Sequence, residues 1–262
     1  MKLRTLFEKR AVSLEPESAN EEKLGRFIAI SDLHIGFEEK FKASGINIKS
    51  NVDFMEAEIE EIVRTTHSEN LVIAGDVKSG TERIFQSEWE NVPRFLSRLA
   101  KVCQVSIVPG NHDGGISNLL PESVILGDIN GILISDTLVL HGHTRPLVKY
   151  SQCRRILMGH VHPVFQKRGS PLSGKPVWAF LKVRRKSIFR EIVEVEEDAT
   201  IEVVVIPSFN LDLAATGYAF EAAQQERRLS PIVKELRSAE EAIVTTLSGE
   251  VIGDQSILPN IL

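Results

Sequence analysis

Cysteine is scarce in this chain of 262 residues, which contains only Cys103 and Cys153. Two cysteines so far apart make neither a disulfide scaffold nor a zinc site with closely spaced thiolates. We therefore expect both to be free thiols in or near the core of an intracellular protein.

Long apolar runs are absent as well, because no stretch reaches the roughly 20 residues that a membrane-spanning helix needs. The first residues carry scattered charges and lack the apolar core of a signal peptide. These absences predict a cytoplasmic protein with no membrane partner.

An excess of positive charge is also missing. The formal net charge is -5 at pH 7, so the field of the whole molecule does not attract polyanions. The densest basic segment, Lys182–Arg190, is followed directly by the acidic segment Glu191–Asp198. We expect both to form a hairpin with solvated, charged faces, and a substrate-binding patch is the alternative.

Strands and helices alternate in the first half of the chain. Apolar residues recur with helical spacing in Asn51–His67, and a second helix is predicted over Ser87–Lys101, with Ser87 as N-cap and Glu90 three positions on. Apolar runs predict strands at Arg26–Ser31, Leu71–Ala74 and Val105–Val108. This β-α-β-α-β order implies parallel pairing.

The second half has a more antiparallel character. The whole chain contains no internal repeat and no low-complexity linker. We therefore predict a single domain over residues 1–262, with a motif core at about 26–165 and C-terminal hairpins and tail at about 177–262. A short helix is expected at Ala219–Arg228. Strands are expected at Ile132–Leu140 (two strands around a turn), Ile156, Val177–Val183, Ile188–Glu196 paired with Thr200–Ile206, and Ala242–Ile252 (a last hairpin).

Six of the seven histidines fall in short polar motifs, each of which directly follows a predicted strand. Loops past the carboxyl ends of strands converge on one crevice in α/β proteins, so these side chains are expected to meet. A meeting point of Asp, His and Asn side chains describes a metal site. The residues are Asp32, His34, Asp76, Asn111, His112, Asp113, His141, His143, His160 and His162.

The number of ligands indicates two metal ions. Asp76 is the natural carboxylate to bridge them, and His141 is favoured over His143 because it directly follows a strand. The mixed oxygen and nitrogen donors suit Mn, Fe or Zn better than Ca or Mg. The proposed ligands are Asp32, His34, Asp76, Asn111, His141, His160 and His162.

Two divalent ions, two aspartates and one bridging hydroxide leave a core charge of about +1, which suits an anionic phosphoester. Such a site lowers the pKa of the bridging water and aligns an in-line attack on phosphorus. His112 is next to a ligand without being needed as one, so it is the candidate general acid. Asp113 is the candidate to orient its imidazole.

In their order along the chain, the motifs D-x-H, G-D, G-N-H-D, H-G-H and G-H-x-H resemble those of the calcineurin-like metallophosphoesterases. The similarity is greatest to the ICC-like phosphoesterases of archaea and bacteria. It implies a four-layer α/β sandwich, in which two mixed β-sheets lie face to face between helices. It also implies one metal held by Asp32, His34, Asp76 and His162, and a second held by Asp76, Asn111, His141 and His160.

The same resemblance implies Mn as the activating ion, with Fe, Zn or Ni as alternatives. Some relatives act as DNA endonucleases associated with a ligase or a helicase, which implies nucleic acid as a substrate and DNA-repair proteins as partners. The chain departs from the phosphoprotein phosphatases, because the second Asp and the Arg of G-D-x-x-D-R-G are missing at Gly75–Gly80.

We therefore predict a binuclear phosphodiesterase, with a DNA or RNA nuclease as its narrower form. His112 favours this prediction, because esters with poor leaving groups benefit most from a general acid. A phosphomonoesterase or nucleotide hydrolase is one alternative. A non-catalytic scaffold is another, but it predicts missing ligands and none is missing.

Several other side chains have two interpretations. Lys78, Arg145 and His143 follow metal motifs, so they are candidates to bind the substrate phosphate, while ordinary loop positions explain Lys78 and Arg145 equally well. His67 is expected to cap a helix. Trp178 is expected in the core, with base stacking as the alternative.

Overall fold

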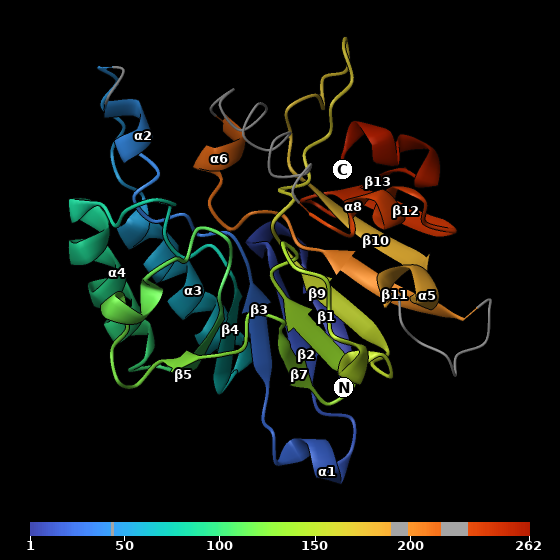
Figure 1. The fold of residues 1–262 in the computed structure, drawn as a ribbon, viewed down its shortest axis with the longest axis horizontal. Helices are drawn as coiled ribbons and strands as arrows, with labels where there is room; N and C mark the ends of the chain where they lie inside the picture. Colours follow the sequence, from blue (N-terminus) through green and yellow to red (C-terminus); the bar gives the residue numbers. More distant parts are fainter. Residues whose placement is uncertain (43–44, 190–198, 216–229) are drawn as a thin grey trace.

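The computed structural model describes residues 1–42, 45–189, 199–215 and 230–262. In this part of the chain two β-sheets lie face to face, and helices cover their outer faces (Figure 1). This four-layer α/β sandwich confirms the predicted fold class. Among the helices described, none is long and apolar enough to cross a membrane.

The first sheet has six strands, and their order in space follows the chain. Strands β1 to β3 pair antiparallel, whereas β3 to β6 pair parallel. The predicted parallel pairing of three strands is thereby confirmed. The strands are β1 (Lys2–Leu6), β2 (Ala11–Glu15), β3 (Phe27–Ile30), β4 (Asn70–Ala74), β5 (Gln104–Val108) and β6 (Ile125–Leu126).

Helices α3 (Val52–Thr66) and α4 (Gln86–Leu99) form the crossovers between β3, β4 and β5 and cover the outer face of the first sheet (Figure 1). Their apolar faces, which include Ile59 and Phe95, pack against residues of that sheet such as Ile73. His67 ends α3 in the left-handed conformation, so its predicted role as a cap is confirmed.

Helix α4 begins one residue before the predicted start, and the predicted N-cap, Ser87, is wrong. Phe85 is the N-cap, and the Glu88 carboxylate accepts the Phe85 N–H at 2.7 Å. The same buried carboxylate accepts the N–H groups of Ser79 and Gly80 at 2.8 and 2.6 Å. Contacts with the loop after β4 therefore decide where the helix begins.

The second sheet has seven strands in the order β13-β12-β10-β11-β9-β8-β7. Strand β9 pairs parallel with both β8 and β11, and the other pairs are antiparallel. Both predicted terminal hairpins, β7–β8 and β12–β13, are confirmed. The strands are β7 (Ile132–Ile134), β8 (Thr137–Leu140), β9 (Arg155–Met158), β10 (Val177–Arg184), β11 (Thr200–Val205), β12 (Glu241–Thr246) and β13 (Val251–Gly253).

The predicted hairpin of Ile188–Glu196 with Thr200–Ile206 is wrong. Strand β11 lies between β10 and β9, so both of its edges already have hydrogen-bonded neighbours. Ile188 instead ends the short helix α5 (Arg185–Ile188). The helix predicted at Ala219–Arg228 lies outside the described residues.

An apolar layer joins the two sheets, with residues such as Val72 from the first sheet and Leu157 from the second. Trp178 is fully buried there, and its indole N–H donates to the Phe7 carbonyl at 3.2 Å, which confirms its predicted core position. Cys103 and Cys153 are free and buried, and burial raises the pKa of each thiol to about 11.

Shorter helices complete the molecule. The outer face of the second sheet packs against α5, α8 (Val233–Arg237) and the 3-10 helix η4 (Gln255–Asn260). In Figure 1, α1 lies at one end of the sandwich, and α2 and α6 lie at the other. The remaining elements are α1 (Ala19–Glu22), α2 (Glu39–Lys42), α6 (Asp212–Ala215), η1 (Phe7–Lys9), η2 (Ile116–Leu119) and η3 (Val148–Tyr150).

Candidate metal centre

Five strand ends carry the predicted site residues, and the two sheets bring these ends to one edge of the sandwich. β3, β4 and β5 run parallel in the first sheet, as do β8 and β9 in the second. Their carboxyl ends lie on the side of α2 and α6 in Figure 1. This edge gathers Asp32 and His34 (after β3), Asp76 (β4), Asn111 to Asp113 (β5), His141 (β8), and His160 and His162 (β9).

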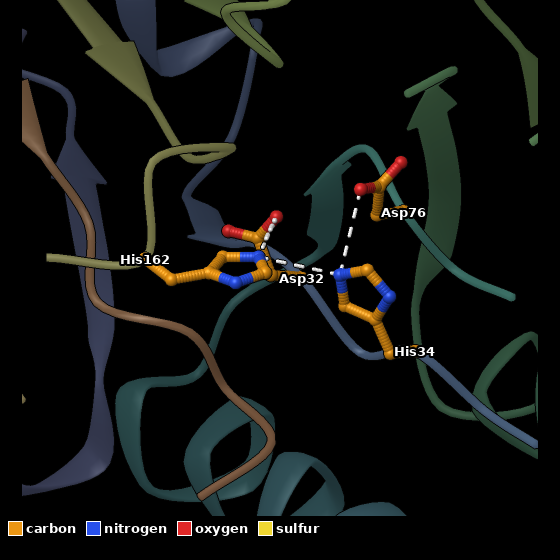
Figure 2. Close-up of side chains that lie close together, drawn as sticks. All are labelled: Asp32, His34, Asp76 and His162. Carbon is orange, nitrogen blue, oxygen red and sulfur yellow. Dashed lines mark hydrogen bonds and ion pairs between the residues drawn. The ribbon is translucent and has the colours of Figure 1, made fainter. Parts of the chain in front are cut away.

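A first group of buried ligand atoms comes from Asp32, His34, Asp76 and His162, and these atoms all lie within 4.8 Å of one another. His162 Nε2 is 3.1 Å from Asp32 Oδ1 and 3.2 Å from His34 Nε2. His34 Nε2 is in turn 3.4 Å from Asp76 Oδ2. Figure 2 shows these contacts as a chain that runs from Asp32 through His162 and His34 to Asp76.

A second group comes from Asp76, His141 and His160. His141 Nε2 lies 3.3 Å from Asp76 Oδ2, 3.2 Å from His160 Nδ1 and 3.1 Å from Asn111 Oδ1. Asp76 Oδ2 therefore takes part in both groups, which is the position that a bridging ligand needs.

The orientation of His141 suits a metal ligand. Its Nδ1 lies 2.9 Å from the Ala74 carbonyl, which can only accept, so Nδ1 carries a hydrogen and Nε2 faces the group. The ring of His143 is centred 5.2 Å from that of His141, and His143 belongs to neither group. The geometry thus brings His141 into the cluster and leaves His143 beside it.

The backbone at these positions adopts an uncommon conformation. Five of the eight non-glycine residues described with positive φ belong to the two groups. Residues other than glycine rarely adopt this left-handed backbone conformation, because it is strained. Backbone strain of this kind concentrates at functional sites. The five residues are Asp32, His34, Asp76, His160 and His162, with φ between 38° and 70°.

Glycines in the motifs allow the ligands to pack closely. A Cβ at Gly75 would lie 2.3 Å from His141 Nδ1, and one at Gly159 would lie 2.4 Å from Asp32 Oδ2. Because these two glycines have no side chain, a ligand from another strand end can lie directly against the backbone of each motif.

Asp76 and His141 shift each other's pKa. Burial opposes ionisation of the Asp76 carboxyl, but His141 beside it holds its pKa well below the usual range. Burial also disfavours a charged His141, but Asp76 raises the pKa of this imidazole to about 10. A divalent cation would replace that proton, because imidazole binds metals in its neutral form.

The pKa values of two other histidines shift in the opposite direction, because burial is the dominant effect there. Burial lowers the pKa of His34 well below the usual value and brings the pKa of His160 to about 3. Both imidazoles are therefore neutral at pH 7, with lone pairs available to a metal.

Unpaired buried atoms provide a test of whether metals fit. Among the described residues, the atom that bears on this test is Asp76 Oδ2, which is buried without a hydrogen-bond partner and lies in both groups of ligand atoms. A buried carboxylate oxygen without a hydrogen bond is costly unless a cation lies beside it, and a metal ion would replace the proton of His141 in that role. Together with the mixed imidazole, carboxylate and amide donors, this arrangement fits two divalent cations of the Mn, Fe or Zn type.

His112 lies at the edge of this centre. Its Nδ1 is 2.7 Å from the Ser79 carbonyl, so Nδ1–H donates, and its Nε2 lies 4.0 Å from Asp76 Oδ2. The Asp113 carboxylate accepts the N–H groups of Val77 and Gly110 at 2.9 and 2.8 Å, which ties the loops after β4 and β5 together. Burial and nearby Asp76 raise the pKa of Asp113 to about 6.

Two of the candidate phosphate-binding residues are held elsewhere. The Lys78 side chain is fully buried, and its ammonium group donates to the carbonyls of Gly80 and His112. The Arg145 guanidinium donates to backbone carbonyls, among them Ser187 at 2.8 Å, and pairs with Glu235 at 3.1 Å. The structure therefore brings neither cation into the cluster.

The basic segment near Arg184 lies away from the centre. Strand β10 runs antiparallel to β11, which runs parallel to β9, so β10 begins at the metal end and Arg184 lies at the opposite end. Lys182 pairs with Glu241 at 2.8 Å, and Arg184 with Glu240 at 2.7 Å. These contacts favour the solvated, charged face over a substrate-binding patch.

Sequence reasoning missed a segment that holds the Asp32 loop. After β11, Ser208 Oγ–H donates to the Asp32 carbonyl at 2.9 Å, and the Asn210 side-chain amide donates to the Leu33 carbonyl at 2.9 Å. Phe209 N–H also donates to the Ser31 carbonyl at 2.9 Å. No motif marks these residues, because they act on backbone groups far away in the sequence.

Comparison with known proteins agrees with this geometry. A sequence model described as calcineurin-like phosphoesterase matches residues 25–169, more than half of the chain. No curated protein is significantly similar in sequence.

Two of the solved structures that are similar to the chain are a nuclease and a phosphoesterase. Nuclease MPE from Pseudomonas putida is 20% identical, with a TM-score of 0.49, and the match covers 79% of this chain and 82% of that protein. The phosphoesterase Yfce from E. coli is 18% identical, with a TM-score of 0.32, and the match covers 55% of this chain and 74% of that protein.

Proposed function

Because the chain belongs to the calcineurin-like phosphoesterase family, we propose that it is a binuclear metal-dependent phosphodiesterase. The observation that carries this proposal is Asp76 Oδ2, a buried oxygen without a hydrogen-bond partner that lies between two groups of ligand atoms. His112 Nε2 faces the same carboxylate from the edge of the centre.

In this proposal the first ion is held by Asp32, His34, Asp76 and His162, and the second by Asp76, Asn111, His141 and His160. When bound, two divalent ions would lower the pKa of water, neutralise phosphoryl oxygens and align the displacement. Mn is the ion we propose, with Fe, Zn or Ni as alternatives that the donor set also accepts.

His112 supplies the general acid. The Ser79 carbonyl fixes Nδ1–H, so the proton that can be transferred is at Nε2, the nitrogen that faces Asp76. A positioned acid contributes about 10² to 10⁴ in rate, and the contribution matters most for a poor leaving group such as an alkoxide. This is the reason for proposing diesters as substrates. Asp113 positions the loop that carries His112.

The test is hydrolysis by metal-stripped protein that has been reloaded with Mn. The substrates are bis-p-nitrophenyl phosphate and p-nitrophenyl phosphate, and the variants are Asp76→Asn and, as a control, the exposed Asp53→Asn. We expect hydrolysis of the diester, a loss of at least about 10³-fold in Asp76→Asn and no change in the control.

Other results would contradict the proposal. Hydrolysis of the monoester alone would identify a phosphomonoesterase or nucleotide hydrolase. Protein that binds two ions and hydrolyses neither substrate would support a non-catalytic scaffold. Full activity of Asp76→Asn would place the reaction outside the described centre.

A further inference from the structure

A surface segment directly after His162 carries positive charge that the proposed reaction does not use. Residues 163–176, which we call the basic loop, contain Lys167, Arg168 and Lys175 and no acidic residue. All three cations are exposed, and none forms an ion pair with a described residue. In a chain with a net charge of -5, the loop is a local positive region.

The base of the basic loop is anchored beside the metal centre. Val177 N–H donates to the Pro163 carbonyl at 2.9 Å, and Val164 forms a bridge with Pro176. A narrow pocket at this base is lined by His162 and by Asn210, the residue that holds the Asp32 loop. The position of the loop is therefore set by the same segments that set the ligands.

The two arms of the loop are also held together further out. Phe165 N–H donates to the Lys175 carbonyl at 2.9 Å, and Gly174 N–H donates to the Phe165 carbonyl at 2.8 Å. In Figure 1 the gold segment between β9 and β10 extends from the site edge beyond the neighbouring elements. The loop is thus a projecting, hydrogen-bonded arm with cations along it.

Its length determines which phosphates the cations reach. Lys175 is opposite Phe165, three residues past His162, and Arg168 is six residues past it. At the rise of a fully extended chain these positions lie at most about 10 and 20 Å from His162. In duplex DNA one strand carries a phosphate every 3.4 Å of axis, so the cations would lie within roughly three to six nucleotides of a diester in the centre.

We propose that the basic loop binds the sugar-phosphate backbone of a polynucleotide, several nucleotides away from the scissile diester. This inference rests on the proposed phosphodiesterase function and identifies its substrate class. A small diester ends before it reaches these cations, whereas a polynucleotide offers a regular row of anions to all three.

The experiment compares two triple variants with the same net charge. One carries Lys167→Gln, Arg168→Gln and Lys175→Gln. The control carries Lys23→Gln, Lys101→Gln and Arg154→Gln, exposed cations that precede β3, β5 and β9 at the opposite edge of the sandwich. The Mn-loaded proteins are assayed on bis-p-nitrophenyl phosphate and on fluorescein-labelled single-stranded DNA of about 20 nucleotides, at several salt concentrations.

For the loop variant we expect kcat/KM on DNA to fall by about 10-fold at low salt, through KM. The slope of log kcat/KM against log salt should become smaller by about 2, since each single-strand phosphate contact contributes about 0.7. Hydrolysis of bis-p-nitrophenyl phosphate should not change, and the control variant should match the wild type on both substrates.

Equal kinetics of the loop variant and the control on DNA would overturn the proposal, as would hydrolysis of bis-p-nitrophenyl phosphate by a wild type that leaves DNA intact. Failure of the wild type to hydrolyse either substrate would instead overturn the proposed function. In that case fluorescence anisotropy of the labelled DNA still tests the loop, because only the loop variant should lose binding.

Discussion

At the scale of single residues, the position of Asp76 depends on the glycine of the next motif. His112 N–H donates to Asp76 Oδ1 at 2.9 Å, and a Cβ at Gly110 would lie 2.1 Å from the same oxygen. The loop after β5 therefore holds Oδ1 on one side, which leaves Oδ2 directed at both groups of ligand atoms.

Gly110→Ala should weaken metal binding, because the added methyl group must displace the Asp76 carboxylate. We expect the affinity for Mn, measured by titration calorimetry, to fall by about 10- to 100-fold, as when a metal ligand loses its positioning contacts. Gly114→Ala is the matched control on the same loop, since its Cβ would meet only the Thr81 carbonyl, at 3.7 Å. Equal affinities of the two variants would refute this role of Gly110.

Lys78 is a second residue whose effect is indirect. Its buried ammonium group donates to the carbonyls of Gly80 and His112, so it holds the backbone of the proposed general acid. In Lys78→Met these two carbonyls lose a charged donor, and we expect His112 to lose its position relative to the leaving oxygen.

The leaving group separates this positioning role from a purely structural one. Nitrophenolate departs without a proton, so Lys78→Met should retain most of its kcat on bis-p-nitrophenyl phosphate. On a dinucleotide, whose alkoxide leaving group needs the proton, kcat should fall by about 10² or more, approaching the loss in His112→Asn. Equal losses on both substrates would show that Lys78 only stabilises the fold.

The sequence was informative about ligands because their positions follow from strand ends. Seven candidate ligands were predicted, and the structure brings all of them to one edge. Lys78 and Arg145, for which phosphate binding and an ordinary loop position were both open, are held elsewhere. A motif shows that a lysine follows Asp76, but only the fold decides whether its ammonium group meets a substrate or the carbonyls of another loop.

At the scale of elements, the first sheet was predictable and the middle of the second was not. Helical spacing and three apolar runs determine the order β3-α3-β4-α4-β5, because parallel neighbours need crossovers. For Thr200–Val205, the same apolar alternation suits an edge strand of a hairpin and a central strand equally well. Its true partners, β10 and β9, are set by packing between segments distant in the chain.

That pairing has a consequence for the site. Because β11 lies beside β9, the residues that follow it pass directly over the loop after β3. Ser208 and Asn210 can therefore donate to the carbonyls of Asp32 and Leu33, which helps to hold Asp32 in its left-handed conformation. An incorrect strand partner in the sequence analysis thus also concealed the segment that supports a ligand.

At the scale of the whole molecule, the metal centre requires that the two sheets stay together. The first sheet supplies Asp32, His34 and Asp76, the second supplies His141, His160 and His162, and the apolar layer between the sheets joins the two sets. The single domain predicted for residues 1–262 stays a prediction, and it requires both sheets to unfold in one transition.

Leu157→Ala tests this coupling, because Leu157 is fully buried in the layer between the sheets. Removing its side chain should lower the free energy of unfolding by about 2 to 5 kcal/mol, from lost apolar contact and the cavity that remains. Urea unfolding is followed by circular dichroism for both sheets and by fluorescence, which reports on buried Trp178 and on the exposed Trp89 of helix α4. Leu133→Ala, at a position 45% exposed on β7, is the control and should cost under about 1 kcal/mol. Coincident transitions that shift together would show one cooperative unit, whereas two transitions, with only one shifted, would divide the chain into two domains.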